Sequence, residues 1–189
     1  AAVSVDPDRI ALAEPNDFEM PAGGLHARWP DPPLEQERRL QQEKLYAALA
    51  YARANGIDKT MLDSPRRRFG IITVGKSYYD VMQAIEDLGI DEKAASAIGL
   101  SVYKVGMVWP LERDGIRAFA EGLEEIIVIE EKRGILENQV KEQLYNWRPD
   151  VRPRVVGKFD EEGNWILPST GELTPARIAR AIAARLEKF

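Results

Sequence analysis

The alternation of hydrophobic and polar positions is most regular in residues 69–89. Residues 69–74 form a short apolar run with β-branched side chains, which predicts a strand covered on both faces, as in a parallel α/β sheet. Apolar residues then recur at helical spacing as far as Gly89, which predicts a helix after a turn at Gly75. Ser77, with Asp80 three positions later, is typical of a capping-box variant at the start of that helix. The stretch therefore predicts the first half of a βαβ unit.

The alternation of a predicted strand and a predicted helix continues toward the C-terminus. Further strands are predicted at residues 100–105, 124–129 and 154–159, and helical periodicity follows each of them. A short strand is also expected within residues 57–63. Because right-handed crossovers join such strands into a mostly parallel sheet, the alternation over residues 60–189 predicts a three-layer α/β/α sandwich.

The first part of the chain has a different character. Residues 1–33 are rich in proline and glycine, which predicts an extended arm, with a flexible linker as the alternative. Residues 34–55 have helical periodicity, polar in the first half and apolar along one stripe in the second. We therefore expect an arm (1–33), a helix linking to the domain (34–58) and an α/β domain (59–189). The apolar side chains that could anchor the arm against a surface are Phe18, Met20, Leu25 and Trp29.

Composition narrows the function classes. The 189 residues carry a net charge of −5, which disfavours a nucleic-acid partner. No apolar run approaches the roughly 18 residues of a membrane helix. The sequence has no cysteine and one histidine, His26, so it holds no disulfide, no thiolate-ligated iron–sulfur cluster and no Cys/His zinc site. The first residues lack the regions of a signal peptide, and we expect a cytoplasmic location.

Candidate chemistry lies where the predicted strands end, because the carboxyl ends of parallel strands share one edge of the sheet. These exits are residues 75–77, 106–110 and 130–134. Residues 75–77 resemble the end of a Walker A loop but lack the glycine that such a loop has between strand and lysine. The candidate ligand-binding or domain-interface residues are Gly75, Lys76, Ser77, Trp109, Glu130, Glu131, Lys132 and Arg133.

The charged candidates admit several interpretations. Glu130 and Glu131 could perform acid–base chemistry, bind a partner's cation, or form charge pairs with Lys132 and Arg133. The three arginines at 66–68 could contact a phosphate, or they could form a solvated connection that pairs with local acids. No catalytic residue and no metal ligand is assigned.

Four separated segments, residues 19–30, 72–78, 102–112 and 127–134, resemble one region of the large, fused indolepyruvate ferredoxin oxidoreductases. In that family the region corresponds to the transketolase C-terminal-like domain that follows the pyrimidine-binding domain. The resemblance implies a five-stranded mixed sheet with one antiparallel edge strand, for which residues 61–63 are the candidate.

The resemblance also implies a parent enzyme that oxidatively decarboxylates aryl pyruvates to aryl-acetyl-CoA and reduces ferredoxin. Such enzymes use thiamine diphosphate, a divalent metal and iron–sulfur clusters. This sequence lacks the family's Gly-Asp-Gly and Asn-Asn pattern for metal and diphosphate, and it has no cysteine. We therefore interpret the chain as a non-catalytic docking domain excised from a larger protein. Its expected partners are the parent's other domains or subunits, with ferredoxin and CoA reached through the parent.

Three alternatives remain open at this point. One is a module that binds CoA or phosphate with residues 75–77 and 66–68. A second is a domain of another transketolase-like thiamine enzyme. A third is an independent small enzyme that uses Glu130 or Glu131. In the parent, Trp29 is expected to anchor the arm, at about 2–3 kcal/mol for the buried indole.

Overall fold

The computed structural model describes residues 6–9, 12–26 and 28–189. The chain divides into two compact units, residues 1–57 and residues 58–189. Each unit is described by itself. The expected division into arm, linking helix and domain stays a prediction.

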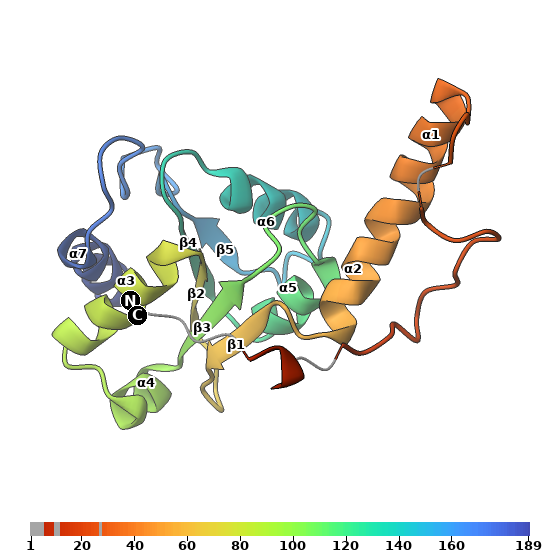
Figure 1. Ribbon diagram of the computed structural model, residues 1–189. Helices are drawn as coiled ribbons and strands as arrows, with labels where there is room; N and C mark the ends of the chain where they lie inside the picture. Colours follow the sequence, from red (N-terminus) through yellow and green to blue (C-terminus); the bar gives the residue numbers. More distant parts are fainter. Residues whose placement is uncertain (1–5, 10–11, 27) are drawn as a thin grey trace. The chain divides into compact units, whose positions relative to one another are not determined.

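The second unit is built on a five-stranded sheet in the order β1-β3-β2-β4-β5 (Figure 1). The strands are β1 (Lys59–Leu62), β2 (Phe69–Val74), β3 (Leu100–Val105), β4 (Glu125–Ile129) and β5 (Arg154–Val156). β1 runs antiparallel to β3, and the other three pairings are parallel. The predicted mixed sheet with one antiparallel edge strand is confirmed.

β2 lies at the centre of the sheet because its whole run can be buried. Five of its six residues are buried, and the strand pairs with β3 on one side and β4 on the other. Gly70 permits close packing in the middle of this strand. A Cβ at that position would lie 2.5 Å from Leu123 Cδ1 and 3.1 Å from Phe119 Cε1.

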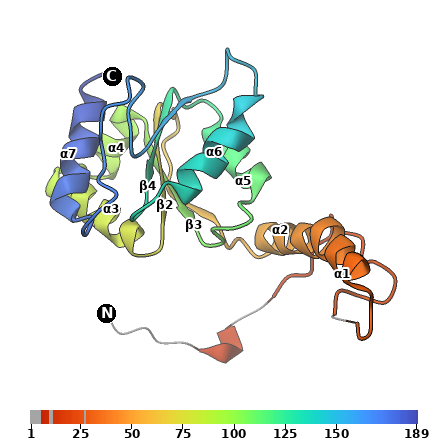
Figure 2. The same cartoon turned by 90° about the horizontal axis from the view of Figure 1, so that it is seen from above.

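Helices cover both faces of the sheet, as Figure 2 shows. On one face lie α3 (Lys76–Asp87), α4 (Glu92–Ile98) and α7 (Pro175–Leu186), and on the other lie α5 (Arg113–Ala120) and α6 (Ile135–Tyr145). Each helix contributes an apolar stripe to one of two cores, as the alternating side chains of the strands require. The three-layer sandwich is therefore confirmed. The main helical contributions to the two cores are Val81, Ala84, Ile85, Ile178 and Ile182 on one face, and Ile116, Phe119, Leu136, Val140 and Leu144 on the other.

Two local predictions are wrong. Ser77 does not cap α3, because Gly75 occupies the N-cap position with a φ of 55° and Ser77 is buried in the first turn. Asp80 instead pairs with Lys76. β5 ends at Val156 and not at residue 159, since the chain turns there into a hairpin in which Phe159 pairs with Trp165.

The first unit consists of a long helix and the segment that precedes it. The helix comprises α1 (Pro33–Arg39), a π-helical turn η2 (Leu40–Lys44) and α2 (Leu45–Ala54), close to the predicted 34–55. A short 3-10 helix, η1 (Pro7–Arg9), lies near the start of the chain.

Polar contacts hold the arm to this helix. The buried Arg39 donates to the backbone carbonyls of Gly24 (2.9 Å) and His26 (3.1 Å). Arg53 pairs with Asp17 at 2.7 Å. Trp29 is 92% exposed, so it does not anchor the arm within the part of the chain that the structure describes, and its anchoring role in a parent protein stays a prediction.

Among the residues that the structure describes, no helix has both the length and the hydropathy that a membrane crossing requires.

Candidate functional site

The exits of the three central strands lie at one edge of the sheet. Val74 at the end of β2 is in register with Val105 of β3, and the neighbouring Thr73 is in register with Ile129 of β4. The candidate residues that follow these strands are therefore brought to the same edge, but their side chains differ in what they contact.

Glu130, directly after β4, points back into the protein. It is 4% exposed, and its carboxylate accepts backbone N–H groups from Ile135 (3.1 Å), Leu136 (2.9 Å) and Glu137 (2.8 Å). These are the first residues of α6, so the carboxylate satisfies donors at a helix N-terminus that lack intrahelical partners. Burial raises the pKa of Glu130, and the N–H groups of Glu137 and Leu136 oppose that rise.

A buried lysine that the sequence analysis missed lies beside Glu130. Lys158, just after β5, is 4% exposed, and its ammonium group donates to the backbone carbonyls of Glu130 and Pro168. Burial lowers the pKa of Lys158, while the nearby carboxylates of Glu130 and Glu137 oppose that lowering.

Glu137 completes this buried cluster. Its carboxylate accepts the backbone N–H of Lys158 at 2.9 Å and pairs with Lys141 at 2.6 Å. Gly157 makes room for it, since a Cβ there would lie 2.4 Å from the Glu137 carboxyl group. We call Glu130, Glu137 and Lys158 the β4-exit cluster. The sequence signal for it was a charged residue, Lys158, inside the strand predicted at residues 154–159.

Glu131 and Lys132 hold the loop of residues 168–173. The Glu131 carboxylate accepts the N–H of Leu173 at 3.1 Å, and the Lys132 ammonium donates to the carbonyl of Gly171 at 2.6 Å. On the β2 side, Lys76 pairs with Glu172 at 3.0 Å. The loop thus bridges the exits of β2 and β4.

Among the described residues, Glu130 and Glu131 do not form the charge pairs with Lys132 and Arg133 that one of the interpretations offered. Both carboxylates accept main-chain N–H groups instead, because these donors at a helix start and in a loop need partners when buried. Arg133 is exposed, as is Gly75, whereas Ser77 is buried.

Trp109, after β3, behaves in the opposite way. Its side chain is 63% exposed, yet its loop is held by side chains on both sides. Gln139 of α6 donates to the carbonyl of Val108 at 2.8 Å, and Asp58 accepts the N–H of Gly106 at 2.7 Å. Burial of Asp58 raises its pKa, an effect that the N–H groups of Met107 and Gly106 oppose. A well-held loop therefore presents an indole to solvent.

The arginines at 66–68 do not join the candidate site. Arg67 forms a bidentate pair with Asp63 (2.7 and 2.8 Å), and Arg68 pairs with Glu124 at 2.6 Å. They precede β2, whereas residues 75–77 follow it. The two segments lie at opposite ends of a six-residue strand, so they cannot form one phosphate cradle.

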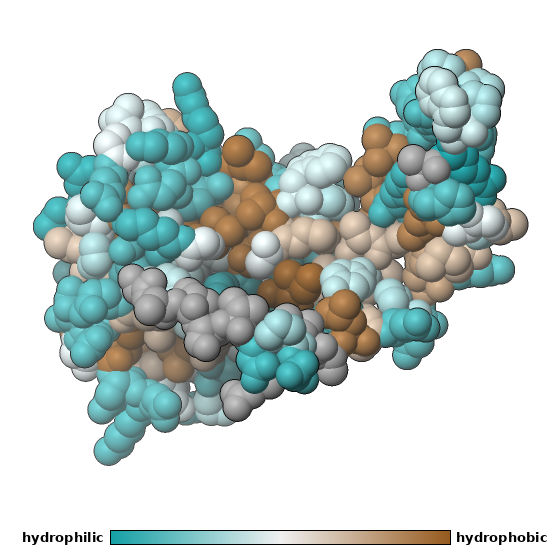
Figure 3. Space-filling model, in the orientation of Figure 1, coloured by the Kyte–Doolittle hydropathy of each residue, from teal (hydrophilic) through white to brown (hydrophobic). Residues whose placement is uncertain are grey.

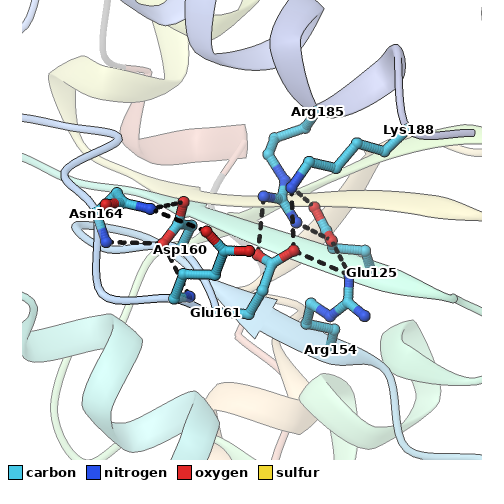
Figure 4. Close-up of polar contacts among 8 residues, drawn as sticks. Glu125, Arg154, Asp160, Glu161, Asn164, Arg185 and Lys188 are labelled. Atoms are coloured by element: carbon cyan, nitrogen blue, oxygen red, sulfur yellow. Dashed lines mark hydrogen bonds and ion pairs between the residues drawn. The ribbon is translucent and has the colours of Figure 1, made fainter.

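A second polar cluster, also missed, lies at the amino ends of β4 and β5 (Figure 4). Glu125 and Arg185 are almost fully buried and form a bidentate pair, one bond of which measures 2.6 Å. Glu161 joins them through Arg185 (2.9 Å) and Lys188 (3.0 Å), and Arg154 bridges Glu125 and Glu161. Hydrogen bonds to the Glu161 carboxylate, first from the backbone N–H of Glu161 and then from Lys188 and Arg185, lower its pKa to about 2. We call this the α7 charge cluster, and it ties the last helix to the sheet.

Neither cluster is arranged to hold a metal ion. Within residues 6–9, 12–26 and 28–189, no group of three or more His, Cys, Asp or Glu side chains is placed for that role.

Residues 58–189 match a family model described as the indolepyruvate ferredoxin oxidoreductase middle domain. Curated relatives include the indolepyruvate oxidoreductase subunit IorA of Pyrococcus abyssi, 31% identical over 116 residues, which are 61% of this chain and 16% of the relative. The IorA subunit of Methanothermobacter marburgensis is 27% identical over 146 residues, 77% of this chain and 21% of the relative. The chain thus spans about a sixth to a fifth of the length of these relatives.

Two solved structures show a weaker likeness. A 2-oxoglutarate:ferredoxin oxidoreductase from Magnetococcus marinus aligns with a TM-score of 0.48 and 16% identity, covering 89% of this chain and 26% of that one. A split-gene transketolase aligns with a TM-score of 0.48 and 20% identity, covering 69% and 41%.

Proposed function

Because the chain belongs to the family of the indolepyruvate ferredoxin oxidoreductase middle domain, we propose that it is a non-catalytic docking domain of such an oxidoreductase. The parent would be a cytoplasmic, thiamine-dependent enzyme that converts an aryl pyruvate and CoA to aryl-acetyl-CoA while reducing ferredoxin. This domain would orient neighbouring domains or subunits and would take no chemical part itself.

The observation that carries this proposal is that the carboxylates at the exit of β4 bind N–H groups of their own domain. An acid–base residue needs a carboxyl group that can reach a substrate. The Glu130 carboxylate instead accepts three N–H groups of its own domain, and Glu131 accepts one. Both carboxylates are therefore engaged in holding the chain together, which supports a structural role.

The exit of β3 supports docking. An exposed tryptophan on a held loop loses little conformational entropy when a partner covers it, and tryptophan is enriched among the residues that dominate interface energies. Ile135, at the start of α6, is also 57% exposed. Figure 3 shows apolar surface in the middle of this face, over the end of β3 and the start of α6. We call Trp109 and Ile135 the docking surface.

The parent's cofactors would be held elsewhere. A thiolate-ligated iron–sulfur cluster needs cysteines, and this sequence has none. The divalent metal that accompanies thiamine diphosphate needs oxygen ligands that converge on one point, and among the described residues no group of three or more His, Cys, Asp or Glu side chains is placed for that role. The residues present do not fit these cofactors, so no step through them is assigned to this chain.

The proposal is tested by titrating the 189-residue chain with CoA and with thiamine diphosphate by calorimetry, and by assaying turnover of indolepyruvate. We expect no turnover, and no binding of CoA or thiamine diphosphate that depends on Lys76. Turnover that falls in Glu130→Gln would overturn the proposal in favour of an independent enzyme, and CoA binding that Lys76→Gln weakens would favour a ligand-binding module at residues 75–77.

A further inference from the structure

A groove of about 710 Å³ lies along α7, and its lining residue Pro168 accepts a hydrogen bond from Lys158 of the β4-exit cluster. Residues of α7 form one wall, and the hairpin tip around Asp160 and Trp165 forms another. The loop at residues 168–171 closes one end. Its volume falls within the roughly 300–1,000 Å³ that is common for small-molecule sites.

The α7 wall carries two guanidinium groups that are not neutralised by carboxylates. Arg177 and Arg180 are exposed and lie one helical turn apart. Among the described residues, Arg177 donates to the backbone carbonyl of Glu172 at 3.3 Å, and neither arginine forms an ion pair. Like charges at this spacing repel each other, and a bound anion would relieve the repulsion.

The opposite wall offers a flat aromatic surface. The Trp165 side chain is 62% exposed and packs against the Phe159 ring, with 4.1 Å between ring centroids. The turn that carries it is held by Asp160, whose carboxylate accepts the N–H groups of Glu162 (2.9 Å) and Asn164 (2.8 Å). An indole fixed in this way can stack against a planar ring at little entropic cost.

The α7 charge cluster fixes the two walls relative to each other. Glu161, in the hairpin tip, pairs with Arg185 and Lys188 of the last helix, as Figure 4 shows. Arg185 is in turn bound to Glu125 of β4. The groove is therefore preformed, and a ligand does not have to order it.

We infer that this groove binds a nucleotide-type ligand: a phosphate group held by Arg177 and Arg180, and a flat ring stacked on Trp165. Guanidinium groups suit phosphate because their paired N–H donors match two of its oxygens. The ring requirement separates this ligand class from inorganic anions. The inference does not depend on the proposed docking function.

The test is calorimetric titration of the 189-residue chain with three probes: ADP, inorganic pyrophosphate and adenosine. We expect ADP to bind more tightly than either part. Arg180→Gln should weaken ADP and pyrophosphate binding at least tenfold. Trp165→Ala should weaken ADP binding at least fivefold and leave pyrophosphate binding unchanged. Arg113→Gln, which removes an exposed arginine from α5, is the matched control and should change neither.

Three outcomes would overturn the inference. The first is the absence of saturable ADP binding at millimolar concentration. The second is an equal loss in Arg180→Gln and Arg113→Gln, which would indicate non-specific charge attraction. The third is Arg180-dependent binding of a poly-glutamate peptide without ADP binding, which would assign the groove to an acidic protein partner. Far-UV circular dichroism of each variant checks that the fold is retained.

Discussion

The exits of β4 and β3 lie at the same edge of one sheet and use their side chains in opposite ways. After β4, the Glu130 side chain turns inward and is 4% exposed. After β3, the side chains of Asp58 and Gln139 hold the backbone while Trp109 remains 63% exposed. The first exit stabilises the domain, and the second presents a rigid apolar surface.

The comparison shows that position at the carboxyl edge does not by itself identify a reactive group. In open α/β sheets this edge is the usual place for ligands. Here the loop of residues 168–173 covers part of it, held by Lys76, Glu131 and Lys132. Which side chains remain available is decided by contacts from distant parts of the chain.

The largest expected effect is the loss of the buried lysine. Lys158→Ala would leave the carbonyls of Glu130 and Pro168 without this donor and the buried Glu130 carboxylate without its nearby cation. We expect the free energy of unfolding to fall by about 3–5 kcal/mol, measured by urea denaturation. Lys141→Ala removes an exposed partner of Glu137 and should cost less than about 1 kcal/mol. Equal losses of unfolding free energy in the two variants would contradict the stabilising role of the buried β4-exit cluster.

A smaller effect is expected at the cap of α6. Glu130→Gln keeps the size of the side chain but leaves one oxygen to accept three N–H groups. The free energy of unfolding should fall by about 1–2 kcal/mol. Glu131 accepts a single N–H group, so Glu131→Gln should lower the free energy of unfolding by less than about 1 kcal/mol. The prediction fails if Glu131→Gln proves the more damaging change.

The two polar clusters should respond to pH in opposite directions. Burial raises the pKa of Glu130 above its usual 4.5, so its contribution to stability is fully present below that value and is lost as pH rises through the folded pKa. The pKa of Glu161 is lowered to about 2, so its contribution is present above 4.5 and is lost as pH falls toward 2. Between pH 7 and pH 3, the destabilisation caused by Glu130→Gln should grow, and that caused by Glu161→Gln should shrink. If the destabilisation changes with pH in the same direction in both variants, the opposite pKa shifts of Glu130 and Glu161 are refuted.

The strands could be anticipated because they depend on local pattern. The apolar run of β2 and the alternation of β3 predict buried strands directly, and the resemblance to a known family supplied the antiparallel edge strand. The capping prediction for α3 failed because a glycine with positive φ, Gly75, takes the N-cap position.

The buried charges could not be anticipated, because their partners are far away in sequence. Arg185 lies 60 residues from Glu125, and Lys158 lies 28 residues from Glu130. A charged residue in a sequence is expected at the surface unless its partner is known. The local sequences around Glu125 and Lys158 therefore gave only weak signals of burial.

The central claim is that this domain docks through the exit of β3 and performs no chemistry at the exit of β4. The most direct test is Trp109→Ala in the full-length parent protein, with Trp165→Ala as the matched loss of an exposed indole. We predict that Trp109→Ala leaves the unfolding free energy of the 189-residue chain within about 0.5 kcal/mol of the unsubstituted chain. In the parent it should weaken subunit or domain association by at least tenfold in analytical ultracentrifugation, while Trp165→Ala does not. Unchanged association in Trp109→Ala would contradict the account.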